Sequence, residues 1–217
     1  MASTPRNGDG TAAPLVPPKP TLPKLRDAAA DCKACDLWER GTQTVFGEGE
    51  AKARVVFVGE QPGDKEDLAG RPFVGPAGAL FDKCLVEAGI DRTLVYVTNV
   101  VKHFKWEPAE TGKRRIHAKP NQKEIKACRP WLDAEISVLR PDAIVCLGAT
   151  AGQALLGKGF RVTKQRGDWI RDSPLAPCVM GTIHPSAILR APDDESRRAE
   201  TERFIEDLRK VARVLRS

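Results

Sequence analysis

The chain has 217 residues, of which 41% are hydrophobic and 29% charged, and Lys and Arg exceed Asp and Glu by 35 − 29 = 6. This length suits one α/β domain rather than two, and no stretch approaches the roughly 20 apolar residues of a membrane span. The first residues lack the apolar run of a secretory signal, so we expect a soluble, intracellular protein. The modest positive excess fits a polyanionic partner.

Elements of an α/β fold follow a Pro-rich start. Five prolines between positions 14 and 23 predict a disordered tail over residues 1–23, with the folded domain over 24–217. Strands are predicted at 54–58, 94–97, 142–147 and 179–183, and helices at 76–88, from 121 onward, at 149–156 and at 195–215. Pro130 is expected to kink or restart the second helix. This alternation predicts a three-layer α/β/α sandwich with a mostly parallel central sheet.

Polar residues directly follow three of the predicted strands. Glu60 and Gln61 follow the first strand, Asn99 follows the second, and His184 follows the last. Ligands of open α/β sheets bind outside the carboxyl ends of the strands. We therefore expect a carboxylate, two amides and an imidazole to meet at one crevice.

Two glycine-rich segments lie near this crevice. The turn 59–63 lacks both the Gly-Lys-Ser/Thr of a phosphate-binding Walker loop and the spacing of a dinucleotide fingerprint, so those two ligand classes are disfavoured. Farther on, Phe73 lies between Gly70 and Gly75. It is either a stacking platform for a ligand or a plug into the core.

The six cysteines indicate buried thiols or metal ligands rather than a disulfide framework. Cys32 and Cys35 form a local chelating pair that needs two more ligands. Cys128, just before Arg129-Pro130, suits the role of a third ligand. The remaining candidates are the other three cysteines and the histidines. Of these, Cys146 is disfavoured because it lies within an apolar strand, where a thiol packs as a small hydrophobe. A basic run, Lys113, Arg114 and Arg115, precedes Ile116-His117 and is either solvated surface or a phosphate contact.

Four ordered segments resemble the iron–sulfur uracil-DNA glycosylases of family 4: Gly59-Glu60-x-Pro62-Gly63, Gly70-Arg71-Pro72-Phe73-Val74-Gly75, Thr98-Asn99-Val100-Val101-Lys102 and His184-Pro185-Ser186. The similarity runs from about Asp31 to the C-terminus. Gln61 replaces the usual alanine, and a Lys-Arg-Arg-Ile-His loop is inserted before Cys128. Both departures are similar to the UdgX subgroup, which becomes covalently attached to DNA after removing uracil.

The resemblance implies a [4Fe–4S] cluster of structural role, with Cys32, Cys35 and Cys128 as ligands. The fourth family ligand is a cysteine at the position of His103, and imidazole can replace thiolate on iron. The resemblance also implies a substrate, uracil-containing DNA, whose target nucleotide is flipped into a pocket.

The same resemblance assigns roles in base recognition and chemistry. Phe73 would stack on uracil, Asn99 would read its O4 and N3–H, His184 would hydrogen-bond O2, and the segment at Gln61 would help to hold the base. Glu60 would stabilise the oxocarbenium-like sugar. His117 would then attack C1′ in place of water, so that the protein acts once.

Arg115, with Lys113 and Arg114, would hold the inserted loop against DNA phosphates, and Asp64 would orient this loop or Glu60. We further expect a cytoplasmic monomer that favours single-stranded DNA and releases free uracil. Two other readings stay open: a multiple-turnover family 4 glycosylase, and a non-catalytic nucleic-acid-binding module.

Overall fold

The computed structural model describes residues 10–110, 112, 114–171 and 173–216, and in this part of the chain the main sheet has five strands in the order β2-β1-β5-β7-β6. Four strands are parallel, and the edge strand β6 runs antiparallel to β7. Their bounds are β1 Val55–Gly59, β2 Val95–Asn99, β5 Ala143–Leu147, β6 Trp169–Arg171 and β7 Cys178–Thr182. The predicted mostly parallel sheet is confirmed.

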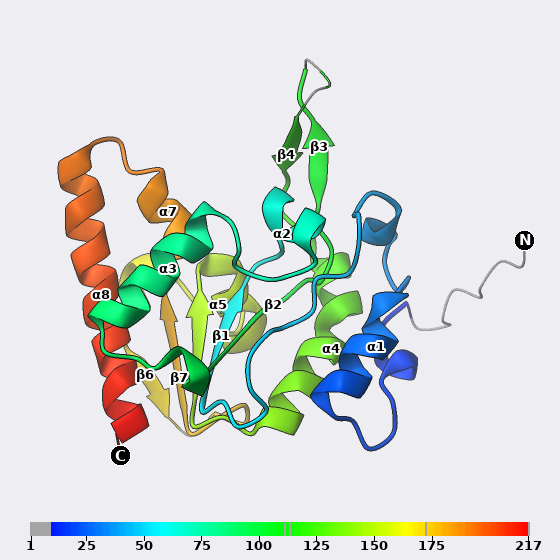
Figure 1. Ribbon diagram of the computed structural model, residues 1–217, viewed down its shortest axis with the longest axis horizontal. Coiled ribbons are helices and arrows are strands. Elements are labelled where there is room, and N and C mark those ends of the chain that lie inside the picture. Colours follow the sequence, from blue (N-terminus) through cyan, green and yellow to red (C-terminus); the bar gives the residue numbers. More distant parts are fainter. Residues whose placement is uncertain (1–9, 111, 113, 172, 217) are drawn as a thin grey trace, which may run out of the picture.

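Helices cover both faces of this sheet (Figure 1). One face carries α3 (Pro76–Glu87), α7 (Pro185–Leu189) and α8 (Asp194–Arg216), and the other carries α1 (Leu22–Ala30), α4 (Gln122–Leu139) and α5 (Ala149–Leu156). Alternate side chains of β1 serve the two layers: Val55 and Phe57 pack into the α3–α8 core, and Val56 and Val58 into the α1–α4 core. This period of two is what a sheet buried on both faces requires. The three-layer sandwich is therefore confirmed.

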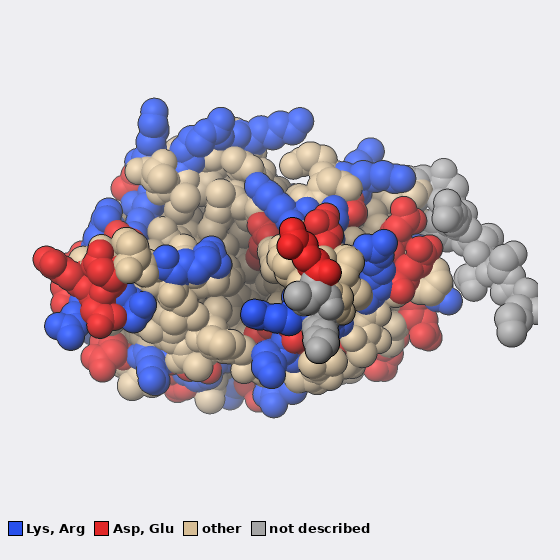
Figure 2. All heavy atoms as spheres, turned by 90° about the horizontal axis from the view of Figure 1, so that it is seen from above, with Lys and Arg blue, Asp and Glu red and all other residues tan. Residues whose placement is uncertain are grey.

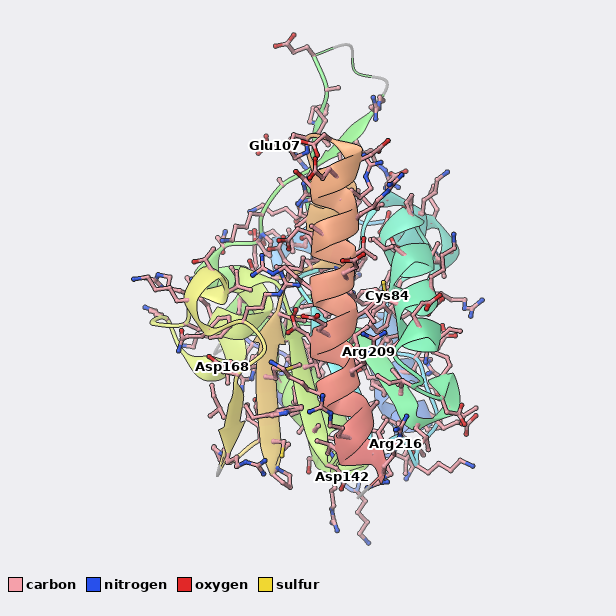
Figure 3. The ribbon with its side chains drawn as sticks, turned by 90° about the vertical axis from the view of Figure 1, so that its left-hand side faces the viewer. Cys84, Glu107, Asp142, Asp168, Arg209 and Arg216 are labelled. Atoms are coloured by element: carbon pink, nitrogen blue, oxygen red, sulfur yellow. The ribbon has the colours of Figure 1, made fainter. Side chains whose placement is uncertain are left out.

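A β-hairpin rises from the end of the molecule at which the parallel strands finish. Its strands are β3 (Trp106–Pro108) and β4 (Arg115–His117), and it projects beyond the body beside the short helix α2 (Asp64–Ala69) (Figure 1). Figure 3 shows Glu107 of this hairpin at the opposite end of the molecule from Asp142, which precedes β5. The hairpin therefore lies at the carboxyl edge of the sheet.

The tail predicted to be disordered over residues 1–23 is ordered in its described part, residues 10–23, and residues 1–9 lie outside the described residues. Ala12 is fully buried, and its N–H donates to the Ala127 carbonyl of α4. Pro23 lies in the first turn of α1, where no helical N–H bond is lost, and Thr21 caps that helix. Of the two effects predicted for Pro130, the restart is excluded, since α4 is one element through residue 139. The kink stays a prediction.

The remaining elements are short: the 3₁₀ helices Ala13–Leu15, Asp36–Glu39 and Arg92–Leu94, and α6 (Val162–Gln165). None of the helices in the described part of the chain is both long and apolar enough to cross a membrane.

Candidate active site at the carboxyl edge of the sheet

Glu60, Asn99 and His184 lie where β1, β2 and β7 end. The chain passes from β1 to β2 on one side and later to β5 on the other, so the carboxyl end of β1 is a topological switch point, where such sheets bind ligands. Seen from above, this end shows a hollow with Lys and Arg side chains around its rim (Figure 2).

Glu60 is held between two partners. One carboxylate oxygen, Oε2, accepts a hydrogen bond from the Thr150 hydroxyl at the start of α5. The other, Oε1, lies 3.5 Å from Nε2 of His117 on the hairpin. The His117 side chain is half exposed and that of Glu60 is 22% exposed, so the pair faces solvent on one side. A substrate can therefore reach a carboxylate and an imidazole together.

His184 is a neutral hydrogen-bond donor in this geometry. Burial, together with the nearby charges of Arg190 and His117, lowers its pKa from 6.5 to about 4. Its Nδ1 accepts the backbone N–H of Ser186 at 3.1 Å, since His184 caps α7. The remaining proton of the neutral ring is therefore on Nε2, which can donate to an acceptor in the crevice.

Asn99 and Phe73 meet at Gly59. Asn99 is 3% exposed, and a Cβ at position 59 would come within 2.3 Å of its Oδ1 and 3.0 Å of the Phe73 ring. Phe73 adopts φ = 57°, which is uncommon for a bulky residue. Its ring lies 6.0 Å from that of His184 and 5.5 Å from that of Phe81. One ring thus contacts the core and also borders the crevice.

The Gln61 side chain holds the hairpin, and the role expected for the backbone at Gln61 in holding the base stays a prediction. Nε2 donates to the carbonyls of Lys105, before β3, and Ala118, after β4, at 3.1 and 3.0 Å. Its Oε1 accepts the N–H of Lys105 at 3.2 Å. The amide is 7% exposed and fully used in closing the base of the hairpin.

Arg115 anchors the hairpin to α2. Its predicted contact with DNA phosphate stays a prediction. Its guanidinium donates to Asp64 and to the fully buried Asp67, each at 2.6 Å. It also lies over the rings of Phe104 and Trp106 at 5.3 and 5.7 Å. Of the two roles proposed for Asp64, the structure shows contact with the loop.

The preceding residue of the basic run, Arg114, makes a backbone contact within the hairpin. Arg114 is exposed on the hairpin, and its carbonyl accepts the N–H of Ala109. Lys113, also predicted to contact DNA, lies outside the described residues.

A buried ion pair supports the strand end that carries Asn99. Lys102 Nζ lies 2.5 Å from Glu135 of α4, and both side chains are at most 1% exposed. Lys102 also donates to Thr98 Oγ1 and to the backbone carbonyl of Asn99. Glu135 further accepts the hydroxyl of Tyr96. Such a network is stable only when its members are paired, as here.

The three candidate cysteine ligands lie in the core between α1 and α4. Cys32 accepts an N–H from Trp131, and Cys128 accepts the backbone N–H of Lys102, at 3.3 and 3.2 Å. Burial raises the pKa of Cys35 to about 11 and that of Cys128 to about 12, so their thiolates require a compensating cation. Buried thiols with N–H donors on sulfur suit an iron–sulfur cluster.

His103 is held through one ring nitrogen. The Thr44 hydroxyl donates to the Ala29 carbonyl at 2.8 Å, so it accepts from His103 Nε2, 3.0 Å away. Burial lowers the pKa of His103 to about 4, which leaves a neutral ring with its lone pair on Nδ1. Within the described residues no group of three ligands is spaced for one metal ion. A four-iron cube spaces its ligands more widely, since each binds a different iron.

Sequence reasoning missed three supports of this site: Thr150, Asp67 and Glu135. Thr150 follows β5, so the strand-end rule that found Glu60, Asn99 and His184 could also have found it. Asp67 and Glu135 carry no local signal, because their partners lie 48 and 33 residues away in the sequence.

Comparison with known proteins agrees with this geometry. A family model described as the uracil DNA glycosylase superfamily matches residues 46–209. A type-4 uracil-DNA glycosylase of Thermotoga maritima is 42% identical over 184 residues, which cover 83% of this chain and 87% of that protein. One from Sulfurisphaera tokodaii is 38% identical over 80% of this chain and 78% of its own length. A type-5 uracil-DNA glycosylase of Pyrobaculum aerophilum is 28% identical over 63% of each chain.

Proposed function

The chain belongs to the uracil-DNA glycosylase superfamily, and we propose that, after excising uracil from DNA, it binds the abasic product covalently through His117. The observation that carries this proposal is the 3.5 Å approach of His117 Nε2 to Glu60 Oε1, at the strand end where the family's chemistry is expected. The proposed substrate is uracil-containing DNA. We further propose that the protein acts in the cytoplasm and as a monomer.

Base recognition is assigned to the buried amide and the ring beside Gly59. Asn99 donates to uracil O4 and accepts from N3–H, an order that cytosine reverses, so a cytosine would leave buried polar groups mismatched. Phe73 stacks on the flipped ring, a contact that contributes about 1–3 kcal/mol at other base platforms.

His184 assists departure of the base. The bond between C1′ and N1 breaks with its electron pair on uracil, and negative charge grows on O2. A neutral imidazole with its proton on Nε2 donates to that oxygen without a cation having to be desolvated. Its low pKa keeps this form present across the physiological range.

Glu60 and His117 both act on the sugar that remains after uracil departs. The carboxylate stabilises the oxocarbenium-like cation, and a lone pair of the His117 imidazole forms a bond to C1′. The alkylated ring then loses its other nitrogen-bound proton to solvent, and the uracil anion takes up a proton. Because an alkyl imidazole is a poor leaving group, the protein stays attached and turns over once.

The cluster proposal rests on the chemistry of the donor set. Cys32, Cys35, Cys128 and His103 would hold a [4Fe–4S] cluster through three thiolates and Nδ1 of the imidazole. When bound, the cluster would cross-link the segment after α1, helix α4 and the segment after β2, and so stabilise the fold. The chain's own contribution is the pair of N–H donors on sulfur and the Thr44 hydroxyl that orients His103.

The test incubates the protein with a uracil-containing oligonucleotide and separates the products on a denaturing gel, with released uracil measured in parallel. The wild-type protein should give a slow-migrating adduct, and peptide mapping should place the sugar on His117. His117→Ala should still release uracil but give no adduct, and Glu60→Gln should slow both steps.

Glu107→Gln, an exposed position on the same hairpin, is the matched control and should behave as wild type. An adduct that persists in His117→Ala would assign the nucleophile to another residue. Free abasic DNA and unmodified wild-type protein would instead indicate a multiple-turnover glycosylase, and unchanged uracil DNA would indicate a binding module only.

A further inference from the structure

The turn between β5 and α5 lies between the two strands that carry Glu60 and His184. The sheet order places β5 between β1 and β7, so Gly148 to Thr150 lie between the residues that follow those strands. Gly148 has φ = 91°, and a Cβ there would lie 3.2 Å from the Cβ of His184. This turn therefore packs on one functional residue and hydrogen-bonds the other.

The hydroxyl of Thr150 donates its single proton to Glu60. Its side chain is 5% exposed, and Oγ1 donates to Oε2 of the carboxylate. The terminal torsion of a glutamate is soft, so an unbonded carboxylate would rotate over a broad range. A donor fixed by the first turn of a helix removes that freedom. The oxygen left over, Oε1, is the one that faces His117.

We propose that Thr150 is a positioning residue for the reaction: it fixes the Glu60 carboxylate so that one oxygen is held by the protein and the other faces the sugar carbon and the His117 imidazole. This inference rests on the proposed function, because Thr150 acts only through the role proposed there for Glu60.

The experiment measures single-turnover rates of uracil release and adduct formation in Thr150→Val, Thr150→Ser and Glu60→Gln. Valine keeps the shape and removes the donor, and should slow both steps about ten- to a hundredfold, the range expected for a lost hydrogen bond to a charged group. Serine should restore rates to within about threefold of wild type. Thr201→Val, on α8, is the matched control, because its hydroxyl bonds only the Arg197 carbonyl.

The double variant Thr150→Val/Glu60→Gln separates positioning from general destabilisation. If Thr150 acts through Glu60, the valine adds less than about twofold to the loss in Glu60→Gln. Wild-type rates in Thr150→Val, or losses that multiply in the double variant, would overturn the proposal. Should valine impair folding, judged by circular dichroism, Thr150→Ala against Thr150→Ser gives the same comparison.

Failure of the proposed function has a different signature. If the wild-type protein releases uracil and forms no adduct, the covalent step is wrong, and Thr150 is still judged on its effect on uracil release. If Glu60→Gln releases uracil as fast as wild type, the role of Glu60 and the positioning role both fail.

Discussion

Replacing Gln61 separates the two steps of the proposed reaction, because its side chain contacts the hairpin and none of the groups assigned to the base. Gln61→Ala removes three hydrogen bonds, two to backbone carbonyls and one from a backbone N–H. At about 1 kcal/mol each, the anchoring lost is about 3 kcal/mol, or roughly two orders of magnitude in the closed population of the hairpin. Arg115 remains as a second anchor and limits this loss.

We therefore expect adduct formation in Gln61→Ala to slow by about ten- to a hundredfold while uracil release stays within about threefold of wild type. Gln61→Glu should be worse than alanine for the adduct, because it places a carboxylate oxygen against the carbonyls of Lys105 and Ala118. Gln165→Ala is the matched control, since that amide bonds Arg161 and lies outside the hairpin.

Two assays check this reasoning. The denaturing gel gives the adduct, and chromatography gives free uracil. Amide hydrogen exchange over residues 105–118 reports hairpin opening directly and should be faster in both variants. Adduct formation at the wild-type rate in Gln61→Ala would refute the anchoring role, as would unchanged exchange of the hairpin amides.

Three further predictions test the supports and the histidine. Arg115→Lys keeps the charge but cannot bridge both carboxylates, so it should cost about 2 kcal/mol in chemical denaturation and reduce adduct yield; an unchanged midpoint would argue against the anchor. Lys102→Met leaves Glu135 buried and unpaired and should cost about 3–5 kcal/mol, partly recovered by adding Glu135→Gln; a loss below about 1 kcal/mol would contradict the pairing. His184 has a pKa near 4 when folded and 6.5 when unfolded, so the unfolded chain binds the proton between these values and stability falls as pH falls through them. This residue accounts for up to about 3 kcal/mol, from (6.5 − 4) × 1.36, and His184→Asn, which retains a capping oxygen, should show a flatter dependence between pH 6.5 and 4.

The sheet was predictable because its signals are local. Each parallel strand is a short, largely apolar run, and β1, β5 and β7 have Gly or Pro at or beside an end. Burial of both faces removes any need for apolar and polar residues to alternate. Glu60, Asn99 and His184 were found because ligands of open α/β sheets bind beyond the carboxyl ends of the strands. The hairpin was not predicted, because its strands are three residues long and one contains Pro108, which is unfavourable in strands.

Contacts between residues far apart in the sequence could not be predicted. Gln61 bonds residues 44 and 57 positions away, and Arg115 bonds Asp64 across 51 positions. A sequence pattern shows that Arg115 is basic but not that two carboxylates already occupy its guanidinium. The Pro-rich start was predicted to be irregular because prolines are unfavourable in a helix interior. They are favourable in the first turn of a helix, where Pro23 lies.

The anchoring of the hairpin bears on why an imidazole could compete with water. In the proposed function, excision of the base is assigned to Asn99, His184 and Glu60 at the strand ends, whereas His117 comes from an element outside the main sheet. A group on a free loop would gain little over solvent, because capture depends on how often it lies within reach of the carbon. Gln61 closes the base of the hairpin and Arg115 fixes β4 to α2, so that His117 is held 3.5 Å from Glu60 before substrate arrives. Loosening either anchor should therefore favour water over the imidazole while uracil excision continues, which makes the ratio of free abasic DNA to adduct the most direct measure of hairpin order.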